Sequence, residues 1–383
     1  MVSNPDPAHV HWVKTPGALD DWLQSEPDEA LALDTEFERV STFFPIPGLV
    51  QLGLGRQFCL VDPSVAEQSD EFRRVLADPD RPKLLYAMSE DLELFRHWLG
   101  VSLTGVVDLQ IGASLAGAGF SVGYARLVER LFGHALDKSA TRSDWLARPL
   151  SPEQERYALD DVRYLKPLYK WVADGLEAKG LTPALAEESA RFADDLNNQA
   201  EPDQYYLKVR GGWHLNQQQQ RLLQALVQWR ELECRERDRP RGRVLADNLL
   251  IAIAEAVPAN TGKLASLPDM PPVVVRRYGE TLLDLVSQTS THSDAGFVMI
   301  TPPLTREQQG TYKQIKRVFS DIAEQQDVPV ELLAPRRRLE ALVRDGMNDS
   351  NQASSTSFNT LFEGWRGAMT SPAKEKIRVI LTS

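Results

Sequence analysis

Two acidic residues near the start of the chain have a spacing that could support metal-dependent chemistry. Asp34 and Glu36 lie two apart in an apolar stretch that is typical of a β-strand. Alternation along a strand places both carboxylates on the same face. A buried face tolerates such a pair only when cations neutralise it, although a lone Asp-x-Glu is more often a solvated strand end. The pair therefore gains meaning only from further ligands elsewhere in the chain.

Further candidate ligands occur on expected helices. Asp91 follows an expected strand and begins a helical pattern, where capping of the helix N-terminus is an equally simple explanation. Tyr157 and Asp161 are four apart in a second helical pattern, so they project from one face, whereas Asp160 points about 100° away and is expected to be solvated. Such an oxygen-only ligand set suits hard cations such as Mg²⁺ or Mn²⁺ better than zinc.

The elements that must position these residues form an α/β domain with a mixed sheet. Short apolar runs predict strands at 31–37, 49–54, 58–61, 83–86 and 106–108. Short loops join the first three, which indicates an antiparallel meander. An amphipathic segment separates the last two, and its length fits a parallel crossover connection.

A long helix is expected after the sheet. Ser151 is a suitable N-cap, Pro152 suits the first helical position, and the pattern runs towards Gly180. Helical periodicity continues beyond this helix and predicts two small all-helical domains. The sequence thus predicts three domains, at 1–200, 205–290 and 303–383.

Two polar segments separate the expected domains. The segment 197–203 breaks the helical pattern, and the Ser/Thr-rich segment 287–303 ends in Pro302-Pro303. Both are predicted linkers. A low-complexity tract near Ser350 is expected to form a mobile loop.

Composition excludes several classes of protein. No apolar run approaches the roughly 20 residues that span a bilayer, and the N-terminus lacks the pattern of a signal peptide. Cys59 and Cys234 are the only cysteines, so neither a disulfide framework nor a thiolate zinc site is expected. A cytoplasmic protein without membrane or disulfide partners follows as the expectation.

The charge is distributed unevenly along the chain. The formal net charge is -11, which by itself argues against a polyanionic partner. Residues 205–250 contain nine Lys/Arg and five Asp/Glu, a net of +4, which leaves -15 for the remainder. Basic residues are therefore concentrated in the first expected helical domain.

Several motifs combine into one family pattern. They are Asp34-Thr35-Glu36-Phe37, Ser89-Glu90-Asp91-Leu92, Lys138-Ser139, the segment 143–150 and the segment 157–165. This combination resembles the ribonuclease D family, in the tyrosine-containing branch of the DEDD superfamily of 3′-to-5′ exonucleases. Later segments are similar to HRDC domains, namely Trp229-Arg230, Asp247-Asn248-Leu249-Leu250, Tyr278-Gly279-Glu280 and, more weakly, the segment 361–366. The resemblance covers essentially the whole chain.

The resemblance implies a fold, a reaction and a partner. It implies an RNase H-like mixed sheet flanked by helices, followed by two helical bundles. It implies that Asp34, Glu36, Asp91 and Asp161 hold two divalent ions, Mg²⁺ or Mn²⁺, and that Tyr157 orients the attacking water. A pair of such ions supplies a nucleophile near neutral pH and neutralises charge on the leaving oxygen. The implied substrate is RNA with a single-stranded 3′ end, typically a tRNA precursor, which is shortened to nucleoside 5′-monophosphates.

Candidate substrate contacts have equally simple structural explanations. Thr35, Phe37, Phe43 and Phe44 lie near the first motif, and the aromatic rings could stack on terminal bases or pack in a core. Lys138 and Arg148 could contact phosphates or form salt bridges. The arginine cluster at 235–243 and the run at 336–338 also have two interpretations. Each could be a surface that binds RNA or a solvated face of ion pairs.

Two other functions remain compatible with the sequence. A 3′-to-5′ DNA exonuclease would use the same ligands, because two-metal chemistry does not itself distinguish a 2′-hydroxyl. A nucleic-acid-binding adaptor with an inactive nuclease site is the alternative from another class. The four filled ligand positions argue against the adaptor.

Overall fold

The computed structural model describes residues 10–198, 201–289, 297–348 and 356–382. The chain divides into two compact units. Unit 1 comprises Met1–Glu38, Ile46–Asn197 and Leu304–Ser383, and unit 2 comprises Arg39–Pro45 and Asn198–Pro303. The predicted tract near Ser350 lies outside the described residues up to position 355, and its last two residues begin the helix Thr356–Asn359.

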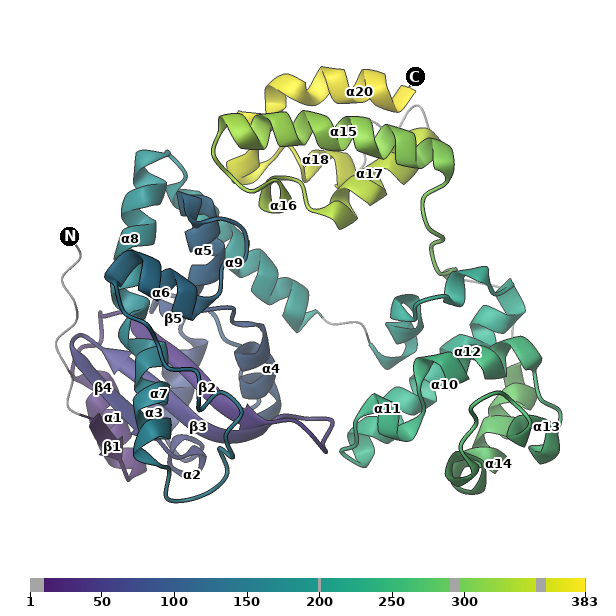
Figure 1. Cartoon of the computed structure of the whole chain (residues 1–383), viewed down its shortest axis with the longest axis horizontal. Helices are drawn as coiled ribbons and strands as arrows, with labels where there is room; N and C mark the ends of the chain where they lie inside the picture. The colour runs from purple at the N-terminus through teal and green to yellow at the C-terminus, as the bar shows by residue number, and fades with distance from the viewer. Residues whose placement is uncertain (1–9, 199–200, 290–296, 349–355, 383) are drawn as a thin grey trace. The chain divides into compact units, whose positions relative to one another are not determined.

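A six-stranded mixed sheet forms the centre of unit 1 (Figure 1). Its strands are β1 (Val10–Val13), β2 (Leu31–Glu38), β3 (Ile46–Leu54), β4 (Gln57–Val61), β5 (Lys83–Leu85) and β6 (Val106–Asp108). Their order is β1-β4-β3-β2-β5-β6, with β2, β3 and β4 antiparallel and with β5 parallel to both β2 and β6. The predicted meander and crossover are confirmed. β1, which pairs in parallel with β4, was not predicted, and His11 interrupts its short apolar run.

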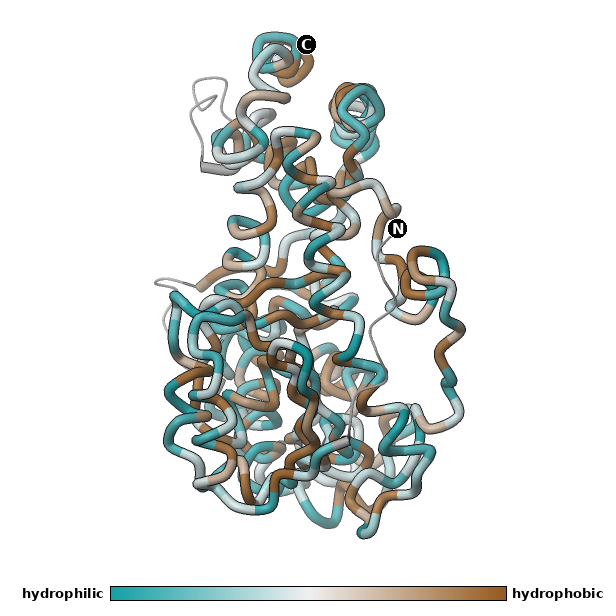
Figure 2. The backbone as a smooth tube through the Cα atoms, turned by 90° about the vertical axis from the view of Figure 1, so that its left-hand side faces the viewer, coloured by the Kyte–Doolittle hydropathy of each residue, from teal (hydrophilic) through white to brown (hydrophobic). Residues whose placement is uncertain are grey.

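Helices cover both faces of this sheet. They are α1 (Pro16–Gln24), α2 (Pro63–Ala66), α3 (Asp70–Ala77), α4 (Ser89–Trp98), α5 (Leu109–Ala113), the π-helix η1 (Ser114–Ala118), α6 (Tyr124–Phe132), α7 (Pro152–Arg163), α8 (Leu165–Ala178) and α9 (Thr182–Asn197). Alternation along β2 directs Leu31 and Leu33 into one core with α1, α3 and α4. Ala32 faces the other core, which α7 and α8 cover. Figure 2 shows hydrophobic and hydrophilic stretches alternating along the helices, as amphipathic packing on a sheet requires.

The long helix predicted after Pro152 is two helices. α7 ends at Arg163 and α8 begins at Leu165, with Tyr164 at φ -97° and ψ -2° between them. Pro167 explains the break, since it has no N–H to donate to the carbonyl of Arg163, four residues earlier, where α7 ends. The predicted end is confirmed, because α8 stops at Ala178, just before Gly180 at φ +66°.

Unit 2 is a helical bundle that also contains the loop between β2 and β3. Its helices are η2 (Pro202–Lys208), η3 (Gly212–His214), α10 (Gln217–Glu236), α11 (Arg241–Val244), α12 (Asp247–Ala256), α13 (Thr261–Ala265) and α14 (Pro272–Thr289). Leu222, Leu226 and Leu250 lie in its core. Phe43, from the β2–β3 loop, is part of the same core.

The C-terminal helical segment belongs to unit 1. Its helices are α15 (Arg306–Gln325), α16 (Val330–Leu333), α17 (Arg336–Asn348), α18 (Thr356–Asn359), η4 (Gly364–Arg366), α19 (Gly367–Thr370), η5 (Ser371–Ala373) and α20 (Lys374–Thr382). Arg366 reaches Glu188 on α9 at 2.7 Å, and Trp365 donates to the same carboxylate. Ion pairing and hydrogen bonding to Glu188 therefore attach this segment to α9, the last of the helices that surround the sheet.

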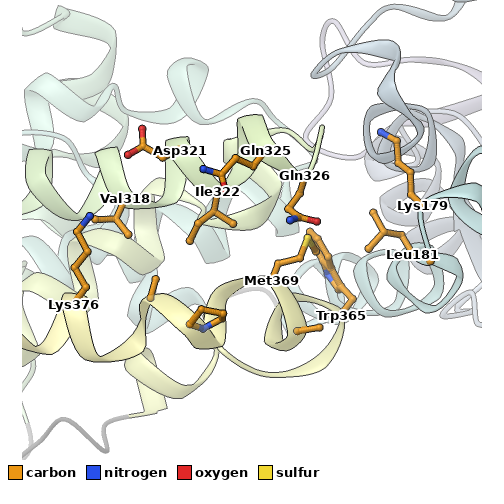
Figure 3. A pocket seen from close by; sticks show the side chains of 14 residues that line it. Lys179, Leu181, Val318, Asp321, Ile322, Gln325, Gln326, Trp365, Met369 and Lys376 are labelled. Carbon is orange, nitrogen blue, oxygen red and sulfur yellow. The ribbon is translucent and has the colours of Figure 1, made fainter.

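A hollow of about 620 Å³ lies where this segment meets the turn between α8 and α9 (Figure 3). Lys179 and Leu181 border it from the sheet domain, and Ile322 and Met369 from the C-terminal segment. None of the candidate catalytic residues lines it, so it is separate from the candidate active site. Among the described helices, none is long and apolar enough to cross a membrane.

Candidate active site

β2 and α7 bring three predicted ligands together. Asp34 and Glu36 alternate along β2 onto the face that α7 covers, and Asp161 lies on α7. A capping box fixes the start of α7, because Ser151 and Gln154 bond to each other's backbone N–H groups. Carboxylate oxygens of Asp34, Glu36 and Asp161 all lie within 4.8 Å of one another. Residues 127 positions apart therefore form one possible cation site.

Asp91 approaches this group from α4. Thr35, between the two β2 ligands, donates a hydrogen bond from its hydroxyl to Asp91 Oδ1 at 2.5 Å. The turn before α4 is held by buried Asp108, which accepts hydrogen bonds from the backbone N–H groups of Ala87 and Met88 at 3.1 and 3.2 Å. Asp91 is outside the set within 4.8 Å, but its charge raises the pKa of Asp34. Thr35, a predicted substrate contact, thus has a visible role in orienting Asp91.

The four carboxylates share an environment that disfavours negative charge. Burial is the largest cause and raises the pKa of Glu36 to about 9 and of Asp91 and Asp161 to about 7. Burial and then the neighbouring carboxylates raise the pKa of Asp34 well above its ordinary range. In the described part of the chain, no Lys or Arg forms a salt bridge with any of the four. Closely spaced acids that no cation of the protein neutralises are suitable ligands for divalent metal ions.

Tyr157 lies beside this group but cannot act as a base. Burial, followed by the charge of Asp161, raises the pKa of its phenol above the ordinary value. Its hydroxyl lies 3.5 Å from Thr141 Oγ1, and its ring centroid lies 5.8 Å from that of Trp145. Tyr157 is therefore a neutral hydrogen-bonding group near neutral pH. Asp160, predicted to be solvated, is instead only partly exposed and pairs with Arg163 at 2.8 Å.

The predicted phosphate contacts have different environments. Arg148 forms a salt bridge with Asp62 at 2.5 Å and donates to the backbone oxygens of Gly48 and Trp145. Of the two roles expected for Arg148, the structure shows the salt bridge. Lys138 is exposed, and Phe37 is half-buried at an irregularity in the β2–β3 pairing.

Phe43 and Phe44 belong to unit 2 rather than to the carboxylate face. Phe43 is 6% exposed, and the guanidinium groups of Arg235 and Arg241 lie 4.9 and 4.8 Å from its ring centroid. Asp238 accepts hydrogen bonds from the backbone N–H groups of both phenylalanines at 2.9 Å. Phe43 thus has the packing role that the sequence left open.

The arginine-rich segment is partly ion-paired. Glu231 is buried and pairs with Arg235 and Arg241, and Glu233 pairs with Arg237. Arg239 and Arg243 are exposed, and no salt bridge to another described residue is found for either. Part of this segment is therefore an ion-paired face, and its two exposed arginines remain candidates for contact with RNA.

Sequence reasoning missed two residues on the carboxylate face. Gln51 on β3 is 0% exposed, and Trp145 is 3% exposed. Neither the Gln51 amide nor the Trp145 indole nitrogen has a hydrogen-bond partner among the described residues. A polar residue inside the apolar run 49–54 was an available signal for Gln51. For Trp145 the signal was its place in the family motif 143–150.

A mixed sheet whose strand β2 and covering helix α7 gather carboxylates suits hydrolysis with divalent metal ions, and the family comparison identifies the class of protein as the 3′-5′ exonucleases. A family model described as 3′-5′ exonuclease matches residues 10–177. An HRDC domain matches residues 219–286, and a ribonuclease D C-terminal HRDC domain matches residues 307–373.

Known proteins narrow this class to one family. Ribonuclease D of Pseudomonas paraeruginosa is 36% identical over 88% of this chain and 90% of its own length. Ribonuclease D of Escherichia coli is 34% identical over 90% of this chain and 91% of its own length. The crystal structure of E. coli RNase D has a TM-score of 0.87, with 32% identity, and covers 96% of this chain and 98% of that one. The chain belongs to the ribonuclease D family and is a 3′-5′ exoribonuclease.

Proposed function

We propose that Asp34, Glu36, Asp91 and Asp161 hold two divalent ions, Mg²⁺ or Mn²⁺, at the phosphodiester bond that is hydrolysed. The observation that carries this proposal is the approach of three carboxylates within 4.8 Å, with no neutralising Lys or Arg among the described residues. Bound divalent ions supply a nucleophile near neutral pH and stabilise the negative charge of the leaving 3′ oxygen.

The residues around the carboxylates have distinct proposed tasks. Thr35 orients Asp91 through the hydrogen bond at 2.5 Å. Tyr157 orients the attacking water with its hydroxyl, since a phenol with a raised pKa keeps its proton at neutral pH. Trp145, whose indole N–H is buried near Tyr157, limits access of bulk water to this side of the site.

We propose that the substrate is RNA with a single-stranded 3′ end, in particular a tRNA precursor with extra 3′ residues. The E. coli relative is described as an exoribonuclease involved in structured RNA processing, which supports this substrate class. Arg239 and Arg243, exposed on unit 2, are suitable contacts for an RNA backbone.

The test uses RNA labelled at its 3′ end, incubated with the full-length protein in Mg²⁺, in Mn²⁺ or in chelator. We expect nucleoside 5′-monophosphates to be released only with a divalent ion. DNA of the same sequence and a mature tRNA lacking the extension serve as matched controls. Equal turnover of RNA and DNA would contradict the RNA preference, and equal turnover of extended and mature tRNA would contradict the precursor proposal.

A further inference from the structure

Gln51 is a polar residue inside the buried strand β3. Its apolar neighbours Val50 and Leu52 are fully buried, and Gln51 itself is 0% exposed. Neither its amide nitrogen nor its amide oxygen bonds to a described residue. Buried side-chain amides nearly always have partners, because an unpaired one keeps the full cost of losing water. An unpaired amide in the core of a strand therefore requires an explanation.

The sheet register places Gln51 beside a candidate cation ligand. Gln51 is paired with Asp34 in the antiparallel ladder between β3 and β2. Directly opposed residues point to the same face of a sheet, with Cβ atoms about 4.5–5.5 Å apart. The neighbouring pair, Leu33 and Leu52, faces the opposite core. Gln51 therefore lies on the face where Asp34, Glu36 and Asp161 gather.

A second buried glutamine has a structural role and serves as a comparison for Gln51. Gln220 on α10 in unit 2 is also 0% exposed. Its nitrogen donates to Leu215 O at 2.9 Å, and its oxygen accepts from Ile300 N at 2.7 Å. Gln220 thus joins two backbone segments through both of its polar atoms. Gln51 has the same burial and the same chemistry, but neither of its polar atoms has a partner in the described part of the chain.

We propose that Gln51 is a positioning residue for Asp34, whose ionised carboxylate accepts hydrogen bonds from the Gln51 amide and is thereby oriented toward a bound divalent cation. The inference rests on the proposed function, in which Asp34 is a cation ligand. A glutamine can turn its amide by rotation about side-chain torsions, so the backbone of β3 need not move.

The chemistry of metal ligands supports this role. Ligating carboxylates are usually hydrogen-bonded by a neighbouring group, which fixes their orientation and tunes their affinity for the ion. Thr35 already serves Asp91 in this way. Asp34 has no comparable side-chain donor among the described residues, and Gln51 is its direct cross-strand neighbour. A neutral amide can donate to a carboxylate without adding a cation that would compete with the metal.

The proposal predicts opposite effects on stability and on cation binding. Gln51→Met keeps the length and volume of the side chain but removes the amide. Without a cation, the variant should unfold at the same temperature as the parent or higher, because a buried unpaired polar group is gone. Its affinity for Mn²⁺ should nevertheless fall by about ten- to a hundred-fold, the effect typical of losing a group that supports a metal ligand.

The experiment compares the full-length parent, Gln51→Met and the matched control Gln220→Met. Mn²⁺ binding is measured by titration calorimetry, and thermal unfolding is measured in chelator. Gln220→Met should lower the unfolding temperature, since it leaves the Ile300 N–H and the Leu215 carbonyl unpaired, and should leave Mn²⁺ affinity unchanged. Parental Mn²⁺ affinity in Gln51→Met would overturn the proposal. A lowered unfolding temperature with unchanged affinity would instead assign Gln51 to packing.

A second measurement needs no variant and therefore does not depend on folding of Gln51→Met. Glutamine side-chain NH₂ signals are followed by NMR in ¹⁵N-glutamine-labelled protein during addition of Mg²⁺. The Gln51 signals should shift and exchange more slowly with water as they gain an acceptor, whereas those of Gln220 should not change. Unchanged Gln51 signals at saturating Mg²⁺ would overturn the proposal.

Asp34→Asn separates failure of this inference from failure of the proposed function. If Asp34→Asn loses Mn²⁺ binding and Gln51→Met does not, only the role of Gln51 is wrong. If Asp34→Asn binds Mn²⁺ as the parent does, the proposed ligand set is wrong and the inference fails with it.

Discussion

The carboxylates of the candidate active site and the buried carboxylate of Glu188 have opposite shifts in pKa. Burial alone would raise the pKa of Glu188, which is 1% exposed, but hydrogen bonds from Arg191 and Arg366 lower it to about 2. Both guanidinium groups lie 2.7 Å from its oxygens, and the Trp365 indole N–H donates at 3.0 Å. At the active site, burial and neighbouring acids raise the pKa of Glu36 to about 9.

The difference lies in where the compensating cations come from. Arginines of the chain itself neutralise Glu188, and its carboxylate joins the C-terminal segment to α9. The four acids of the candidate active site have no such partner in the described part of the chain, so their charge is left for an external cation to neutralise. Glu188, with protein cations, therefore holds the fold together, whereas the acids without them are candidates for binding metal ions.

The largest expected effect is loss of turnover on removing one ligand charge. Asp34→Asn or Asp161→Asn should reduce turnover of 3′-labelled RNA by about a thousand-fold or more, since activation of the nucleophile and stabilisation of the leaving group are lost together. The fold should be retained, because asparagine keeps the shape of the side chain. Activity within about tenfold of the parent would remove that residue from the ligand set.

Tyr157→Phe should have a smaller effect on the same reaction. If the hydroxyl orients the attacking water, its loss should lower the single-turnover rate by roughly ten- to a thousand-fold. Mn²⁺ affinity should stay near the parental value, because a neutral phenol is not a cation ligand in this proposal. A phenylalanine variant as fast as the parent would assign Tyr157 to packing against Trp145.

Glu188→Gln should act on stability. The carboxyl pKa lies at about 2 in the folded protein and at 4.5 ordinarily, so ionised Glu188 contributes roughly 3 kcal/mol to the free energy of unfolding above pH 4.5. Because the folded pKa is depressed, this contribution is lost as the pH falls from 4.5 towards 2. The parent and the variant should therefore differ in urea unfolding at pH 7 and converge in acid. A constant difference across that range would contradict the assigned role.

The smallest expected effect concerns removal of metal. Because their pKa values are raised, the acids of the metal-free folded protein favour the protonated form. Their ionisation should therefore destabilise the fold increasingly as the pH rises from about 5 to 9. Mn²⁺ binds the ionised form, so the gain in unfolding temperature on adding Mn²⁺ should grow over the same range. The gain should be small in Asp34→Asn at every pH. A gain independent of pH in the parent would place the ion elsewhere.

Local spacing predicted much of the fold and the site. Alternation put Asp34 and Glu36 on one face, and a separation of four put Tyr157 and Asp161 on one side of α7. Strand composition and turn lengths predicted the meander and the crossover. These features depend on residues close in sequence, whose relative geometry is set by the backbone of a single element.

The pairing between elements that are distant in the sequence could not be predicted from local spacing. Gln51 lies opposite Asp34 only because β2 and β3 pair in one register, and a shift of one residue would turn it to the other core. Pro167 was present in the sequence, yet the amphipathic pattern continued across it and concealed the break between α7 and α8.

The sequence by itself determined which residues are candidates for the chemistry and on which elements they lie, since periodicity and motif spacing are local properties. The tertiary structure decided which charges are neutralised. Asp238 accepts a hydrogen bond from the backbone of Phe43 across 195 positions, and Arg366 pairs with Glu188 across 178 positions. No local pattern announces such contacts, because they form only when separately folded surfaces pack together and exclude water.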